Sequence, residues 1–157
     1  GYTEYHKKGI SNSTPKMLGY QAEGAAPFIQ GSRVYNPETI ATAIRIGNPQ
    51  SWDQALKLSK ESNGWFDSFS DEEILVTQKM LTEKEGIFCE PASAISVAGA
   101  LRDIKSGKIP DGSSVVCTLT GHGLKDPDTA IAQCDPSAMI NVNPTLEEVK
   151  KAILNNM

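Results

Sequence analysis

The sequence predicts an α/β fold with three layers and a mostly parallel sheet. Short β-favouring runs alternate along the chain with helix-length segments that carry capping signals. The run at 114–120, Ser-Val-Val-Cys-Thr-Leu-Thr, favours strand without a break, as in a parallel strand that is covered on both faces. The 157 residues are enough for one domain with a sizeable core.

The first third of the chain predicts few regular elements. Residues 1–14 are polar and indicate a helix end followed by a loop. Residues 16–22 predict a short buried strand. The stretch 36–49 contains two prolines and a glycine, so we expect it to be irregular around a short helical turn.

Two helices with capping boxes flank an aromatic strand. Ser51 with Gln54 predicts a helix over about 51–62, and the Asn-Gly pair that follows predicts its end. The alternating aromatic segment 65–69 predicts a strand. Ser70 with Glu73 predicts the next helix. That helix continues to about residue 85 and should stop at the glycine that comes next.

The remaining elements follow in the same alternating order. We expect a three-residue buried strand at 87–89, a helix from Pro91 to about residue 106, a turn at 111–112, the strand 114–120 and a last helix at 146–154. The helix after Pro91 is rich in Ala, Ser and Gly, which allows its backbone to approach a neighbour closely. Thr145 with Glu148 predicts a capping box for the last helix.

The bulk composition excludes several classes of function. The net charge of −4 argues against nucleic acid, which needs a basic face, and gives no polybasic patch for an anionic membrane. No apolar run reaches the ~18 residues that a membrane span needs. Cys89, Cys117 and Cys134 are odd in number and widely spaced, so we expect reduced thiols in a cytoplasmic protein. The first residue is Gly1, and we expect a part cut from a longer chain.

Three segments are candidates for a binding site. Thr-Gly-His-Gly at 120–123 follows the predicted strand 114–120, and ligands bind beyond the carboxyl ends of parallel strands. An ordinary strand-to-loop turn would explain it equally. Glu90 lies between a short strand and a helix; it is either a buried charge in need of a partner or a helix-capping carboxylate. Arg45 suits an anionic ligand, although a surface salt bridge is the alternative.

Other kinds of site lack support in the sequence. It contains neither a Gly-x-x-x-x-Gly-Lys phosphate loop nor a Gly-x-Gly-x-x-Gly turn after a strand. The histidines and cysteines lack the spacing of zinc ligands. Cys117 and His122 would make a conceivable nucleophile pair. Because Cys117 falls inside a predicted strand, we interpret it as a core thiol.

Four segments together resemble the threonine synthase family. They are Gly-Tyr-Gln-Ala-Glu-Gly-Ala-Ala-Pro at 19–27, Pro-Glu-Thr-Ile-Ala-Thr-Ala-Ile-Arg-Ile-Gly at 37–47, Glu-Pro-Ala-Ser-Ala at 90–94 and Leu-Thr-Gly-His-Gly-Leu-Lys-Asp-Pro at 119–127. They occur in family order and cover residues 1 to about 130, while the last ~25 residues match loosely. The resemblance implies the fold-type II architecture of pyridoxal-phosphate enzymes, similar to the tryptophan synthase β subunit, with the cofactor between two α/β domains.

The resemblance also implies an activity and a set of site residues. The reaction would convert O-phospho-L-homoserine and water to L-threonine and phosphate with pyridoxal 5'-phosphate. Thr120 matches the family threonine that bonds the pyridine nitrogen, and a hydroxyl there tunes the cofactor without holding its nitrogen protonated. Gly121 and Glu90 are expected at the cofactor, and Arg45 is expected to line the substrate site. The family further implies a homodimer.

Two family features have no counterpart in this sequence. The lysine that forms the Schiff base lies in a Phe-Lys-Asp motif upstream in the family, and no such motif occurs here. The glycine-rich loop for the cofactor phosphate is also missing. We therefore expect residues 1–157 to be the C-terminal cofactor-binding portion of the enzyme, inactive without the N-terminal part, and we assign no catalytic residue to it.

Two other functions remain open from the sequence. Another fold-type II lyase, such as a threonine or serine dehydratase, would share the cofactor motifs; the Ala-Thr-Ala-Ile-Arg-Ile-Gly-Asn-Pro stretch at 41–49 favours the synthase. A non-catalytic domain that binds a protein partner would explain the missing lysine. It would not explain the Thr-Gly-His-Gly motif at 120–123.

Overall fold

The chain contains two compact units. The computed structural model describes residues 1–134 and 140–155. The units are Gly1–Asp126 and Pro127–Met157, and each is considered by itself. The four segments that resemble the threonine synthase family all lie in the first unit, apart from the proline that ends the last of them.

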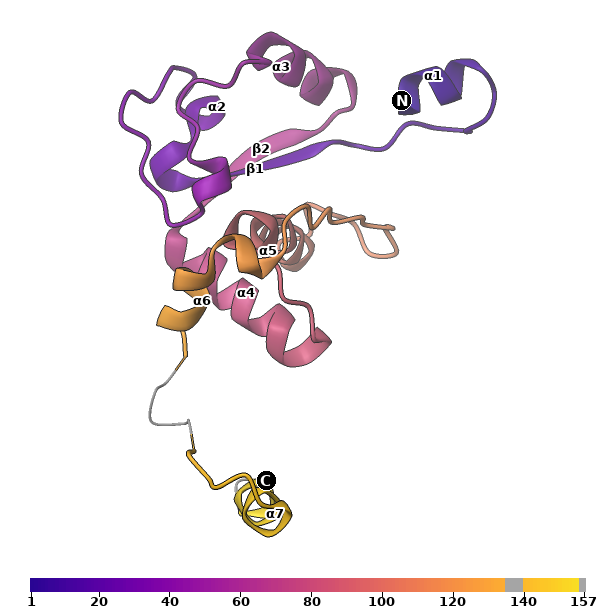
Figure 1. The fold of residues 1–157 in the computed structure, drawn as a ribbon. Coiled ribbons are helices and arrows are strands. Elements are labelled where there is room, and N and C mark those ends of the chain that lie inside the picture. Colours follow the sequence, from indigo (N-terminus) through magenta and orange to yellow (C-terminus); the bar gives the residue numbers. More distant parts are fainter. Residues whose placement is uncertain (135–139, 156–157) are drawn as a thin grey trace. The chain divides into compact units, whose positions relative to one another are not determined.

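A two-stranded parallel sheet is the centre of the first unit (Figure 1). Its strands are β1 (Leu18–Ala22) and β2 (Trp65–Phe69), and the register places Leu18 opposite Trp65. The two strands are joined through a long segment that includes a helix, as a parallel connection requires. The strands predicted at 16–22 and 65–69 are therefore confirmed, and their parallel pairing agrees with the predicted mostly parallel sheet.

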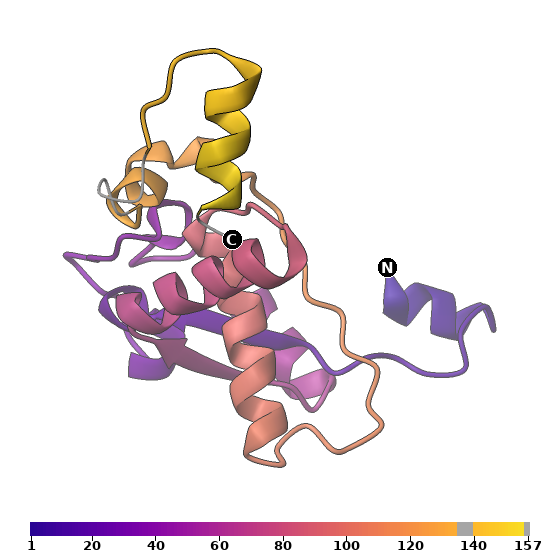
Figure 2. The same ribbon diagram turned by 90° about the horizontal axis from the view of Figure 1, so that it is seen from below.

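Helices lie on both faces of this sheet (Figures 1 and 2). The elements of the first unit besides the strands are α1 (Tyr2–Lys7), η1 (Glu23–Ala25), α2 (Pro27–Gln30), η2 (Thr42–Ile44), α3 (Trp52–Glu61), α4 (Asp71–Glu85), α5 (Pro91–Lys105) and η3 (Gly123–Lys125). On one face, Phe28 of α2 stacks on Phe66 of β2 with ring centroids 4.4 Å apart, and it also contacts Trp52 of α3 at 4.8 Å. On the other face α5 packs on both strands, and α4 packs on α5.

Two of the three predicted capping boxes lie in the first unit, and they have different outcomes. Ser70 is extended, its hydroxyl accepts the Glu73 N–H, and the Glu73 carboxylate accepts the Ser70 N–H, so this box is confirmed. Gly86 ends α4 at φ 68°, as predicted. Ser51 precedes α3 but makes no capping bond, because its φ of −97° and ψ of 41° are not the extended geometry that an N-cap needs. The capping box at Ser51 is therefore wrong, although the helix is present.

Small residues bring α5 close to the sheet, as the composition predicts. A Cβ added at Gly99 would meet the ring of Tyr20 from β1. Tyr20 in turn packs edge-on against Phe69 of β2, with centroids 5.6 Å apart. The core around this contact consists of Ala22, Ala41, Phe69, Ile74, Ile95 and Ala98.

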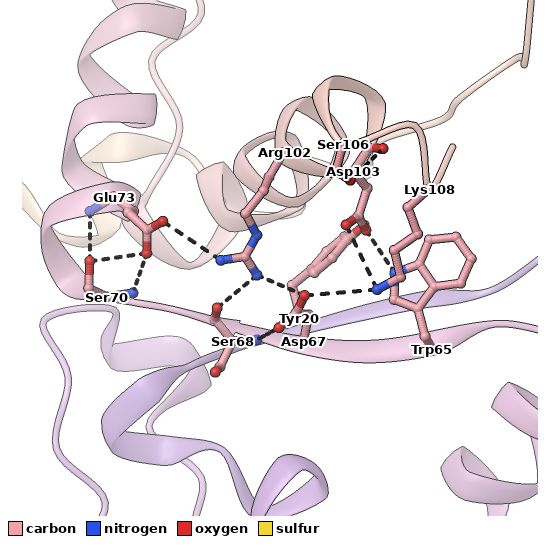
Figure 3. A network of polar contacts seen from close by, with 10 residues as sticks. All are labelled: Tyr20, Trp65, Asp67, Ser68, Ser70, Glu73, Arg102, Asp103, Ser106 and Lys108. Carbon is pink, nitrogen blue, oxygen red and sulfur yellow. Dashed lines mark hydrogen bonds and ion pairs between the residues drawn. The ribbon is translucent and has the colours of Figure 1, made fainter. Parts of the chain in front are cut away.

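A buried carboxylate joins the C-terminal end of α5 to both strands (Figure 3). Asp103 is 3% exposed, and its Oδ2 accepts hydrogen bonds from the Tyr20 hydroxyl and from Trp65 Nε1, each at 2.7 Å. Lys108 Nζ lies 3.9 Å from Asp103 Oδ1 and stacks over the Trp65 ring. Burial and the hydrogen bond to Asp103 raise the pKa of the Tyr20 hydroxyl above its usual range.

Arg102 connects the same helix to β2 and α4 (Figure 3). Its guanidinium lies 3.6 Å above the centroid of the Phe69 ring. It donates to the Ser68 carbonyl oxygen at 3.0 Å and pairs with Asp67 at 2.9 Å. A longer ion pair of 3.7 Å reaches Glu73 on α4. The end of α5 is thus bonded to three separate elements.

The strand predicted at 114–120 is wrong for this structure. Residues 113–120 form no strand, and residues 87–89 contribute only an isolated antiparallel bridge between Cys89 and His122. A parallel strand takes its hydrogen bonds from a neighbouring strand. The described residues contain two strands, β1 and β2, which pair with each other. Val116 is accordingly 87% exposed rather than covered on both faces.

In residues 127–134 and 140–155, the second unit contains two short helices, α6 (Pro127–Ala132) and α7 (Leu146–Leu154). The last helix has the predicted bounds, and the Thr145 hydroxyl accepts the Glu148 N–H at 3.4 Å. The Glu148 carboxylate binds Asn143 instead of completing the box. In the part of the chain that the structure describes, no helix combines the length and hydropathy needed to cross a membrane.

Candidate cofactor-binding site

The structure brings together two of the three segments selected from the sequence. The Glu90 N–H donates to the Gly121 carbonyl oxygen, and the Gly123 N–H donates to the Phe88 carbonyl oxygen, each at 3.0 Å. These two bonds flank the bridge between Cys89 and His122. Because they fix the turn against the residues before α5, the Thr-Gly-His-Gly segment lies at the N-terminal end of that helix.

Ser93 links the helix to the turn. Its Oγ accepts the Gly121 N–H at 2.9 Å and lies 3.4 Å from Thr120 Oγ1. Ser93 is 2% exposed, whereas the Thr120 side chain is exposed. Ser93 belongs to the segment 90–94 that resembles the family, but no role was predicted for it. The signal that would have found it is a small hydroxyl residue in the first turn of a helix that follows a short strand.

Glu90 is buried beside the same turn. Its residue is 4% exposed, and a Cβ added at Gly121 would meet its carboxylate. Glu90 occupies the N-cap position of α5 but makes no side-chain capping bond, so the capping explanation is wrong. A residue with a side chain at position 121 would displace the Glu90 side chain, and this close approach explains why the turn has glycine there.

Side chains next to the turn at 120–123 also pack against it or bond the residues that hold it. Gln78 on α4 donates from Nε2 to the Cys89 carbonyl oxygen at 2.7 Å. The Phe88 ring contacts His122 edge-on at 5.5 Å and occupies the space where Gly123 would carry a Cβ. His122 Nδ1 accepts the Leu124 N–H at 3.1 Å, which starts the turn η3.

Cys117 and His122 do not form a contact with each other in the way a nucleophile pair requires. The Cys117 thiol donates to the Ser96 carbonyl oxygen at 3.5 Å, while His122 Nδ1 is engaged by Leu124. Burial raises the pKa of the Cys117 thiol, against the lowering effect of its bond to Ser96. A raised pKa leaves less of the reactive thiolate at neutral pH. Cys117 is half-buried, outside any strand, and is better described as a packing thiol.

The contacts of Arg45 are with residues outside this cluster. It follows η2 and pairs with Glu38 at 3.9 Å, with 41% of its side chain exposed. The loop that carries it is fixed to α4, because the Ile40 N–H donates to Asp71 at 3.0 Å. The surface salt bridge considered from the sequence is therefore present. A role at the substrate stays a prediction.

The donors at the turn fit one end of a pyridoxal phosphate ring. The ring nitrogen can accept one hydrogen bond, and the exposed Thr120 hydroxyl, backed by Ser93, is a neutral donor. Gly121 allows this turn to lie directly against the buried Glu90 side chain, because a Cβ at position 121 would meet the Glu90 carboxylate. The remaining contacts of the cofactor, above all a lysine and a phosphate-binding loop, are not supplied by these residues.

The comparison with known families identifies the class of enzyme to which the chain belongs. The family model described as "Pyridoxal-phosphate dependent enzyme" matches residues 1–121, and the chain belongs to this family. The matched region ends at Gly121, so it includes Glu90, Ser93 and Thr120.

Within that family the chain is a homologue of threonine synthases. It is 50% identical to the threonine synthase of Synechocystis sp. over 153 residues, which cover 98% of this chain and 40% of that protein. It is 52% identical over 144 residues to the threonine synthase of Mycobacterium tuberculosis strain H37Rv, covering 92% and 40%. It is 55% identical over 131 residues to the threonine synthase of Mycobacterium leprae, and the match covers 83% of this chain and 36% of that protein. The chain thus spans about two fifths of the length of the curated relatives that it matches.

A solved structure of a threonine deaminase from T.th. is also similar. It is 22% identical, with a TM-score of 0.49, and the match covers 62% of this chain and 37% of that one.

Proposed function

We propose that this chain is the C-terminal cofactor-binding portion of a threonine synthase. The complete enzyme would convert O-phospho-L-homoserine and water to L-threonine and phosphate. The observation that carries the proposal is an identity of about half to threonine synthases from different organisms over more than nine tenths of the chain. The matched region contains the turn at Thr120 and the residues that hold it.

In this proposal the chain supplies one side of the cofactor site. Pyridoxal phosphate supplies an electron sink that stabilises negative charge at the substrate carbon. Thr120 donates its hydroxyl proton to the ring nitrogen, and Ser93 and Gly121 hold Thr120 in place. Glu90 supports the turn from the buried side. Arg45 would bind an anionic group of the substrate if the complete protein brings the loop 37–47 to the site.

The chain requires the other part of the enzyme for activity. No residue here matches the family lysine or the phosphate-binding loop, so residues 1–157 would act only with the rest of the protein. A fold-type II architecture with three layers, a homodimer and a cytoplasmic location are further parts of the same proposal. The parallel pairing of β1 and β2, with helices on both faces, supports the architecture. Three cysteines without a disulfide in the described chain are compatible with the cytoplasm.

A chimeric enzyme tests the proposal. This chain replaces the aligned part of the Synechocystis sp. threonine synthase, with the unmodified host enzyme and a host lacking the aligned part as controls. We expect the chimera to release phosphate from O-phosphohomoserine and to form threonine, while the deleted host does neither.

Two results would contradict the proposal. Faster release of ammonia from free threonine or serine than of phosphate from O-phosphohomoserine would favour a dehydratase. A folded chimera that binds pyridoxal phosphate poorly and turns over none of these substrates would favour a non-catalytic domain.

A further inference from the structure

The hydrogen bonds of Ser93 determine where its own proton can go. A serine hydroxyl has one proton to donate and two lone pairs that accept. One lone pair of Ser93 Oγ accepts the Gly121 N–H at 2.9 Å. The proton is therefore free for an acceptor, and the side-chain oxygen next to it is Thr120 Oγ1 at 3.4 Å.

Burial gives this pair a direction. Ser93 is 2% exposed, so an unpaired hydroxyl proton there would be costly. The Thr120 side chain is exposed, so its hydroxyl proton can be donated to solvent or to a ligand. Donation from Ser93 to Thr120 satisfies the buried group first. The opposite arrangement would leave the Ser93 proton without a hydrogen-bond acceptor among residues 1–134 and 140–155.

We infer that Ser93 is a positioning residue that makes Thr120 a hydrogen-bond donor. Ser93 donates its proton to Thr120 Oγ1, and the Thr120 proton therefore points to the exposed side. The next step rests on the proposed function: the acceptor on that side is the ring nitrogen of pyridoxal phosphate. A nitrogen that accepts a hydrogen bond is not protonated, so Ser93 would help to hold the ring nitrogen neutral.

The two contacts of Ser93 differ in strength. The bond from Gly121 has an ordinary length, while 3.4 Å is longer than the usual ~2.5–3.0 Å between two hydroxyl oxygens. We therefore expect Ser93 to protect the Gly121 amide strongly and to bias the Thr120 side chain more weakly. Both effects can be measured in the chain without cofactor.

The first experiment uses the 157-residue chain and nuclear magnetic resonance. Ser93→Ala should speed hydrogen exchange of the Gly121 amide about five-fold, the effect of losing one ordinary hydrogen bond. It should also allow the Thr120 side chain to sample several rotamers, seen in its three-bond couplings. Ser93→Thr, which keeps the hydroxyl, should restore both readings toward the original.

Two further variants separate the hydroxyl from its surroundings. Ser96→Ala is the matched control, because Ser96 lies on the same helix and its hydroxyl bonds only the Ser93 carbonyl oxygen, at 2.9 Å. It should change neither reading. Ser93→Cys keeps the approximate size of the side chain but is a poor hydrogen-bond donor. It should give the two readings expected of Ser93→Ala, and it replaces that variant if Ser93→Ala fails to fold. Unchanged Thr120 couplings in Ser93→Cys and Ser93→Ala would overturn the inference.

The second experiment follows the ring nitrogen in the chimeric enzyme. With nitrogen-15 in the ring of pyridoxal phosphate, its chemical shift reports the protonation state. Ser93→Ala should shift the protonation of the ring nitrogen to higher pH, and Ser96→Ala should leave this titration unchanged. An identical titration in all three proteins would overturn the step to the cofactor. If the unmodified chimera fails to act on O-phosphohomoserine, the proposed function fails, and the Gly121 and Thr120 readings still decide the role of Ser93.

Discussion

The two ends of helix α5 are held in different ways. At the C-terminal end, Asp103 is buried and receives two bonds of 2.7 Å from the sheet, and Arg102 adds contacts to β2 and α4. At the N-terminal end, Ser93 holds a backbone turn whose Thr120 hydroxyl is exposed. The first end uses its polar groups within the fold, and the second presents one outward. The difference separates the residues that stabilise the chain from those that we propose bind the cofactor.

The largest expected effect is at the C-terminal end. Asp103→Ala leaves the Tyr20 hydroxyl and the Trp65 N–H without their common acceptor, and unsatisfied buried donors cost about 1–3 kcal/mol each. Both side chains are partly exposed, so water compensates in part, and we expect a loss of about 3 kcal/mol. Urea unfolding of the chain measures it. Asp111→Ala, in an exposed turn, is the control; equal stability of the two variants would contradict the anchoring role.

Two glycine substitutions compare the turn at the N-terminal end of α5 with the middle of this helix. A Cβ at Gly121 would meet the buried Glu90 carboxylate, and a Cβ at Gly99 would meet the Tyr20 ring. Overpacking costs about 1–3 kcal/mol. In the helix, Gly99→Ala regains up to about 1 kcal/mol of helix propensity, so Gly121→Ala should destabilise the chain more.

A second substitution identifies the cause at Gly121. Adding Glu90→Ala to Gly121→Ala should cost less than the sum of the single changes, because the clash disappears with the carboxylate. Strict additivity of the two unfolding free energies would show that the strain at Gly121 has another source.

The alkaline side of the stability curve reports the Tyr20 contact. Burial first, and then the Asp103 carboxylate, raise the pKa of Tyr20 above that of an unfolded tyrosine. The contribution is therefore complete below about pH 10 and decreases as the pH rises further, because the unfolded chain ionises first. Tyr20→Phe should cost about 1 kcal/mol at neutral pH through the lost hydrogen bond. It should also reduce the alkaline loss, and an unchanged pH profile would contradict this assignment.

The comparison also explains what the sequence could predict. The helix at 71–85 was predictable because Ser70 and Glu73 are three residues apart, and the signal is local. Asp103 was not selected, because it bonds Tyr20 and Trp65 across 83 and 38 positions of sequence. No periodicity links such residues. Only the folded sheet brings them to the same carboxylate.

The candidate site was predictable where its residues form contiguous motifs. Glu90 and Gly121 each belong to a short run with a recognisable pattern, and the structure places them in contact. Ser93 lies in the same run as Glu90 but was given no role, because nothing in the run shows that its hydroxyl accepts the Gly121 N–H. The strand at 114–120 was predicted wrongly, since its composition favours a strand but the hydrogen bonds of a parallel strand depend on a neighbour that local sequence does not specify.

The smallest effect on stability is expected at Thr120, where the effect on the cofactor should be largest. Thr120→Val keeps the branched shape and removes the hydroxyl. The side chain is exposed and its contact with Ser93 is long, so unfolding of the chain should change by less than about 1 kcal/mol. In the chimeric enzyme the same change should weaken cofactor binding by about 1 kcal/mol, or roughly five-fold, and reduce turnover further because the ring nitrogen is tuned by this bond. Thr120→Ser keeps the hydroxyl and should be milder in both respects. If Thr120→Val matched the unmodified chimera in both cofactor affinity and turnover, Thr120 would not be part of the site. That result would not change the role of Asp103 in anchoring α5.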